Sequence, residues 1–95
     1  MNEQQIQKKI IDYLRSIGAY TVKTIVTNSS GTPDLLVSFK GHFIAIEVKA
    51  AKGRVSELQK WHLDQIRKSS GIAFVAKSVD EVKLGLFKAG LIEEH

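Results

Sequence analysis

The chain contains no cysteine, so disulfide bonds and thiolate metal sites are excluded. It also lacks any apolar run near the roughly 20 residues that a membrane-spanning helix needs. Its N-terminus is polar and helix-forming, unlike a secretory signal peptide. We therefore expect a cytoplasmic protein with no membrane partner.

Motifs of several enzyme classes are missing as well. There is no G-x-x-x-x-G-K-S/T loop and no dinucleotide-binding fingerprint. The histidines at positions 42, 62 and 95 lack the spacing of zinc ligands. Serine, histidine and aspartate are all present, but no pattern places them together as a catalytic triad.

Length and composition predict one domain, residues 1–95. The apolar content of 43% is ordinary for a globular protein. A chain of this length buries about 60–65% of the surface that it exposes when unfolded. We find no internal repeat and no low-complexity linker in the sequence.

Hydrophobic periodicity predicts the order α-β-β-β-α-β-α. We expect one helix over residues 3–17, a second that begins at Ser56 and a third from Ser78 to near Gly90. The second and third open with Ser-x-x-Gln and Ser-x-x-Glu capping boxes. The expected strands cover residues 20–26, 35–39, 43–50 and 72–76. In the second helix we expect Leu58, Trp61 and Ile66 to be buried.

The most informative feature is an acidic residue that opens one predicted strand and an acid and a lysine that close the next. These are Asp34, in Gly31-Thr32-Pro33-Asp34, and the segment Glu47-Val48-Lys49. If Lys40-Gly41 is a two-residue hairpin loop, Asp34 lies directly opposite Glu47. Opposed residues have Cβ atoms about 4.5–5.5 Å apart, and Lys49 points to the same sheet face as Glu47. A loop longer by one residue would shift the pairing but keep the acids close.

Each of these residues also has a purely structural interpretation. An Asp after Pro can cap a turn, and Glu and Lys at alternate positions can form a solvated strand face. However, two opposed carboxylates repel each other unless something neutralises them. A divalent cation together with Lys49 would do so, and such a centre can activate water to hydrolyse a phosphodiester.

Basic and hydroxyl side chains surround this predicted centre. The net charge is +4, and Glu57 is the only acid between residues 48 and 63. A phosphate backbone would suit this surface, although small basic domains need not bind an acidic partner and a polar loop can be an ordinary connection. The predicted DNA contacts are Ser29, Ser30, Thr32, Lys52, Arg54 and Lys60.

The segments around Asp34 and Glu47 together resemble the PD-(D/E)XK nuclease superfamily. Within it, the chain resembles the virus-type replication-repair nuclease (VRR-NUC) domain. The features that carry this narrower resemblance are Glu3 in the first helix, Pro33 directly before Asp34, and Gln59 in the helix after the lysine. The resemblance extends from Glu3 to about Phe87.

This resemblance implies an α/β fold with a three-layer, restriction-endonuclease-like core, in which helices flank a mixed central sheet. It also implies an endonuclease that needs Mg²⁺ or Mn²⁺. Asp34, Glu47 and the backbone carbonyl of Val48 would hold the metal, and Lys49 would orient or help to deprotonate the attacking water.

Two more side chains have competing interpretations. Glu3 could complete the metal site through water or a second ion, or could simply favour the start of its helix, with Asn2 as the N-cap. Gln59 could contact the metal site, or could serve only the capping box with Ser56.

Stand-alone viral members of the family cut four-way (Holliday) junctions as homodimers, so the resemblance implies branched or double-stranded DNA as partner. If the chain is phage-encoded, it would act in the host cytoplasm. The alternatives are a flap or nicking nuclease in repair, and a non-catalytic DNA-binding module of the same fold.

Overall fold

The computed structural model describes residues 1–94 and has the predicted element order; His95 lies outside the described residues. The helices are α1 (Glu3–Ser16), α2 (Glu57–Lys68) and α3 (Val79–Lys88). The strands are β1 (Tyr20–Lys23), β2 (Leu35–Phe39), β3 (His42–Val48) and β4 (Ile72–Ala76).

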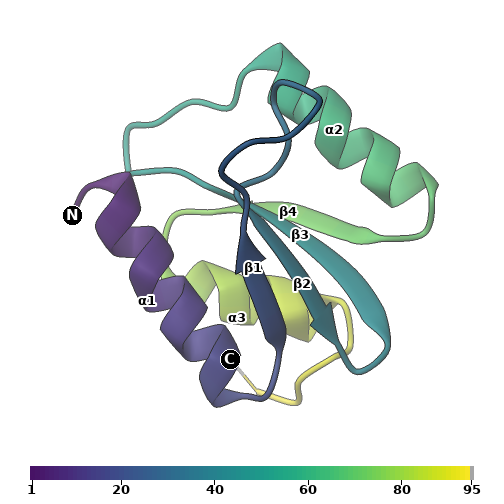
Figure 1. Cartoon of the computed structure of the whole chain (residues 1–95). Coiled ribbons are helices and arrows are strands. Elements are labelled where there is room, and N and C mark those ends of the chain that lie inside the picture. The colour runs from purple at the N-terminus through teal and green to yellow at the C-terminus, as the bar shows by residue number, and fades with distance from the viewer. Residues whose placement is uncertain (95) are drawn as a thin grey trace.

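The strands form one mixed sheet in the order β1-β2-β3-β4 (Figure 1). β2 is antiparallel to both β1 and β3, whereas β4 is parallel to β3. A parallel neighbour requires a crossover connection, and α2 lies in that connection. α2 packs on one face of the sheet, and α1 and α3 pack on the other, which confirms the predicted three layers.

The β2–β3 hairpin has the predicted register. Phe39 pairs with His42, and the ladder continues to Leu35 opposite Ile46. Lys40 and Gly41 have φ angles of 50° and 80°, and positive values at both central positions are what a type I′ turn requires. Asp34 and Glu47 follow as the next opposed positions.

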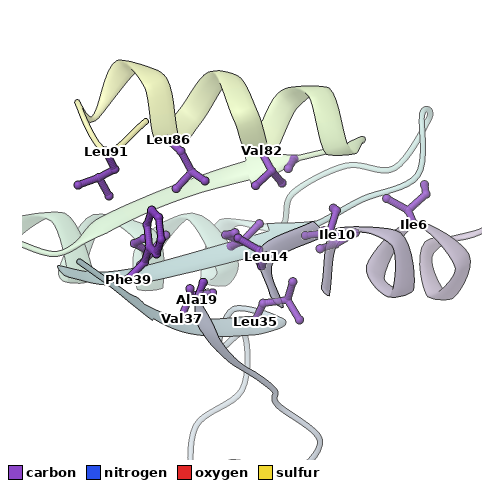
Figure 2. Close-up of a cluster of buried hydrophobic side chains, with 14 residues drawn as sticks. Ile6, Ile10, Leu14, Ala19, Leu35, Val37, Phe39, Val82, Leu86 and Leu91 are labelled. Atoms are coloured by element: carbon purple, nitrogen blue, oxygen red, sulfur yellow. The ribbon is translucent and has the colours of Figure 1, made fainter. Parts of the chain in front are cut away.

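The main hydrophobic core lies between the sheet and the α1–α3 layer (Figure 2). Ile10 and Leu14 from α1, Leu35 from β2, and Val82 and Leu86 from α3 are fully buried there. The core beneath α2 is much smaller, and its buried members are Ala45, Leu63 and Ala73. Side chains alternate along β3, so Ala45 and Glu47 face α2.

Our prediction that Leu58 and Trp61 are buried was wrong. Their exposed fractions are 47% and 53%, and Ile66 is half-buried. The reason is the small contact area beneath α2. Leu63 and Ile66 already cover the strip of sheet made by Ala45 and Ala73. Leu58 and Trp61 therefore lie outside this strip and remain exposed.

The first strand is also shorter than predicted, because it ends at Lys23 rather than at residue 26. The Thr24 N–H still donates to the Asp34 carbonyl at 2.9 Å. Beyond that point Pro33 has no N–H to offer a partner strand. Ile25 and Val26 therefore leave the sheet and enter the β1–β2 loop.

The predicted start of α3 needs a smaller correction. Ser78 Oγ accepts a hydrogen bond from the Glu81 N–H at 3.1 Å, as predicted. The Glu81 carboxylate, however, accepts from the N–H of Lys77 at 2.9 Å rather than from Ser78, so the capping box is not reciprocal.

Candidate active site

Asp34 and Glu47 lie at the same end of β2 and β3, on the face covered by α2. Asp34 Oδ2 accepts a hydrogen bond from the backbone N–H of Val48 at 2.8 Å. This bond ties the start of β2 to the end of β3 through a side chain. Asp34 therefore stays beside Glu47.

Glu47 is buried, with an exposed fraction of 2%. Its Oε2 accepts a hydrogen bond from Gln59 Nε2 at 3.0 Å and lies 3.4 Å from Lys49 Nζ. Its Oε1 is buried without a hydrogen-bond partner among the described residues. Burial and the charge of Asp34 raise the pKa of Glu47 from 4.5 to about 7, against an opposing effect of Lys49.

This donor set fits a hard divalent cation. A buried carboxylate oxygen without a partner is costly, and a second carboxylate beside it adds repulsion. Oxygen ligands of this kind suit Mg²⁺ or Mn²⁺. Across residues 1–94, no three His, Asp or Glu side chains gather closely enough to bind a metal. The remaining ligands would therefore be backbone carbonyl and water.

Gln59 makes two kinds of contact, one within the capping box of α2 and one to the buried Glu47. Its Oε1 accepts from the Ser56 N–H at 2.9 Å, and Ser56 Oγ accepts from the Gln59 N–H at 3.1 Å, which completes the capping box. Its Nε2 remains free to bond Glu47. One amide thus anchors α2 and orients the buried acid.

Glu3 is less closely connected to these residues. It is the first residue of α1, which lies on the sheet face opposite to Glu47 and Gln59. It is half-buried and does not join Asp34 and Glu47 in a three-residue group within residues 1–94. It could approach the site only around the end of the sheet.

The three predicted loop residues take part in hydrogen bonds within the β1–β2 connection or from it to α2. Thr32 Oγ1 donates to the Ser29 carbonyl at 2.8 Å. Ser29 Oγ lies 3.1 Å from His62 Nε2, and the same nitrogen lies 2.8 Å from the Ser30 carbonyl. The loop is therefore attached to α2. Together with Asp34 it encloses an open cavity of about 470 Å³.

His62, which attaches the β1–β2 loop to α2, was missed by our sequence reasoning, because we tested the histidines only as zinc ligands. The available signal was its spacing from Gln59. Residues three apart on a helix are neighbours, so a helix that directs Gln59 toward the site also places His62 near it.

The predicted basic residues lie on the segment after β3 and on α2. Lys52 and Arg54 are exposed. Lys60 Nζ lies 3.2 Å from Glu57 Oε1, an ion pair between exposed side chains. Lys77 Nζ donates to the carbonyl of Ala51 at 2.9 Å, an interaction that sequence patterns did not indicate. It holds the basic segment against the β4–α3 connection.

The model of the VRR-NUC domain family matches residues 1–80. The chain belongs to the VRR-NUC family. It is thus a nuclease of the PD-(D/E)XK superfamily. None of the curated proteins compared with the chain matches it. No helix within residues 1–94 has the length and apolar character to cross a membrane.

Solved structures agree with this assignment. One VRR-NUC domain superposes with a TM-score of 0.76 at 27% identity, covering 90% of this chain and 94% of that one. A second VRR-NUC domain protein gives 0.75 at 18% identity, covering 98% and 89%. Hjc, a Holliday junction resolvase from Archaeoglobus fulgidus, gives 0.61 at 22% identity, covering 77% and 65%. The fold is restriction-endonuclease-like.

Proposed function

We propose that this VRR-NUC protein is a metal-dependent, structure-specific DNA endonuclease that cuts four-way junctions as a homodimer. Residues 1–95 would form the single nuclease domain. The observation that carries the proposal is the buried Glu47 carboxylate. It lies beside Asp34, has one oxygen without a partner among the described residues, and is held by Gln59 and Lys49.

Asp34, Glu47 and the backbone carbonyl of Val48 would hold Mg²⁺ or Mn²⁺. Glu3 would contribute through water or a second ion. A bound cation supplies positive charge for the phosphate and makes a bound water more acidic. The residues of the chain position the carboxylates that would bind the metal. The Val48 N–H orients Asp34, and Gln59 orients Glu47.

Lys49 would act on the reacting groups themselves. Its ammonium lies 3.4 Å from Glu47 Oε2 at the end of β3, with only 12% of the side chain exposed. From there the ammonium can orient the attacking water, and its positive charge can help to deprotonate that water by favouring loss of the proton to solvent. It can also offset the charge that develops on the phosphate oxygens.

The DNA would be held mainly by its phosphates. Lys52 and Arg54, on the exposed segment after β3, and Lys60, on α2, would bind them with ammonium and guanidinium groups. Ser29, Ser30 and Thr32 would add hydroxyl and backbone groups. Such contacts read the shape of the backbone rather than its sequence, which favours a branched substrate. The fold likeness to a Holliday junction resolvase supports the choice of four-way DNA.

A cleavage panel tests this proposal. Labelled duplex, flap, splayed-arm, single-stranded and four-way DNA would each be incubated with Mg²⁺ or Mn²⁺. We expect metal-dependent cleavage that is fastest on the four-way junction. Faster cleavage of flaps or nicked duplex would support the repair alternative. DNA binding without cleavage of any form would identify a non-catalytic module.

A further inference from the structure

The β1–β2 loop exposes two adjacent aliphatic side chains next to the site. Ile25 and Val26 have exposed fractions of 86% and 90%, the highest among the large apolar residues of the described chain. The loop extends beyond the end of the sheet and lies beside the N-terminal part of α2 (Figure 1). Removing aliphatic side chains from water is favourable, so a pair exposed at this position is suited to contact a binding partner.

The exposure does not come from a loosely held loop. Thr24 Oγ1 donates to the carbonyl of Pro33 at 2.8 Å, at the base of the loop. On the other arm, His62 Nε2 lies 2.8 Å from the Ser30 carbonyl. Gly31 packs so closely on α2 that an added Cβ would lie 2.9 Å from Leu58 Cγ. Both arms of the loop that carries Ile25 and Val26 are therefore attached, one to the start of β2 and the other to α2.

The cavity of about 470 Å³ connects this aliphatic pair to the site. Ile25 and Val26 line it together with Asp34, and Asp34 is its only charged lining residue. The other lining residues are neutral threonines, serines and Gly31. A DNA strand with a phosphate at Asp34 would have its neighbouring nucleotide at this cavity. Its volume is in the range that holds small ligands.

We infer that Ile25 and Val26 form a wedge that enters the DNA at a branch point and unstacks the nucleotide next to the scissile phosphate. The freed base would occupy the cavity beside Asp34. Aliphatic side chains inserted between base steps unstack DNA in this way, and unstacking is least costly where pairing is already disturbed. The inference rests on the proposed nuclease function and explains how one site would prefer branched DNA.

The test compares the double variant Ile25→Ser/Val26→Ser with the wild type on two junctions. One is fully paired, and the other carries two unpaired thymidines at the branch point. On the paired junction we expect the single-turnover cleavage rate to fall by about tenfold, since the variant cannot unstack the base. On the bulged junction, where the base is already free, the two rates should agree within about twofold.

Two control variants accompany it. Ile25→Leu/Val26→Ile keeps the aliphatic bulk and should cleave the paired junction like the wild type. Tyr20→Ser removes another exposed apolar side chain, at the opposite end of β1, and should also have no effect. An equal loss of rate on both junctions, or no loss on either, overturns the wedge. So does a double variant whose molar mass in light scattering has fallen to that of a monomer, because the pair would then be a protein contact.

A second measurement does not depend on cleavage. In a Glu47→Gln background, 2-aminopurine at the branch point should become more fluorescent on binding, and Ile25→Ser/Val26→Ser should remove that increase. If the wild type cuts none of the DNA forms, the proposed function fails. The fluorescence still tests whether Ile25 and Val26 unstack a base. An increase that the double substitution removes supports this role, and the absence of any increase overturns it.

Discussion

Gln59 and Glu47 are joined by a hydrogen bond of 3.0 Å between Nε2 and Oε2, and the same glutamine caps α2 through its Oε1. The helix and the buried acid therefore depend on one side chain. Loss of Gln59 would release Glu47 and weaken the first turn of α2 together, whereas loss of Ser56 would weaken only the turn.

This difference gives the first prediction. Gln59→Ala should slow cleavage by about tenfold or more, as is common for groups that orient metal ligands. Ser56→Ala should lower the free energy of unfolding by about 1 kcal/mol through loss of the cap, with little change in rate. Urea unfolding and single-turnover cleavage measure the two effects. Equal reductions of rate in both variants would mean that the helix start, not the bond to Glu47, matters for activity.

Glu47→Gln should abolish cleavage while preserving the fold and DNA binding. The neutral side chain keeps the shape of the buried residue but cannot supply the negative charge that a metal ligand needs. Cleavage at low Mg²⁺ concentration and binding in a gel-shift assay measure the two properties. Near wild-type cleavage by this variant would show that the site is assigned wrongly.

The raised pKa of Glu47 predicts how stability depends on pH in the absence of metal. The folded protein keeps a proton on Glu47 up to about pH 7, whereas the unfolded chain loses it near 4.5. Between these values the folded state binds more protons, so its stability should fall as the pH rises. Thermal melts in EDTA should show this decline, and Glu47→Gln should flatten it.

Added Mg²⁺ should reverse this trend, because metal ligands must be deprotonated to bind. The gain in melting temperature on adding Mg²⁺ should thus be larger at pH 8 than at pH 5.5. A gain that is the same at both pH values, or that survives in Glu47→Gln, would place the cation elsewhere.

Lys52→Ala and Arg54→Ala should weaken DNA binding without abolishing cleavage at saturating DNA. For duplex DNA, the slope of log K against log salt becomes shallower by about 0.9 for every phosphate that the protein no longer neutralises. Lys88→Ala, an exposed lysine at the end of α3, is the matched control and should leave the slope unchanged. If cleavage disappears at saturating DNA while the slope stays the same, these residues belong to catalysis rather than to binding.

The proposed dimer should have roughly twice the chain mass in light scattering at micromolar concentration and should cut junctions symmetrically. Specific protein–DNA interfaces bury about 1,000–2,500 Å² of protein surface, which two copies of so small a chain supply more easily than one. Two-fold symmetry would also place two Asp34–Glu47 centres on opposed strands. A monomer that nicks one strand would contradict the resolvase hypothesis and leave the nuclease hypothesis intact.

The hairpin and its two acids could be predicted from sequence because the determinants are local. Lys40-Gly41 fits a two-residue turn, and counting from it aligns Asp34 with Glu47. Trp61 and Ile25 could not be placed in this way. Helical periodicity marks an apolar residue but not the width of the surface that its helix covers. Strand propensity likewise marks Ile25 but not the point where its partner strand begins.

The Lys40–Gly41 turn sets the register of β2 and β3. This register determines whether Asp34 lies opposite Glu47 at the other end of the hairpin. Asp34 lies five positions before Phe39, which corresponds to about 17 Å of strand. A shift of the β2–β3 register by one position would direct either Asp34 or Glu47 to the opposite face of the sheet, even though the two residues would stay close along the ladder. Exposed loops usually tolerate changes of length. This loop would tolerate an insertion only if the register were kept, because a shifted register would separate the two carboxylates while leaving every site residue in the sequence.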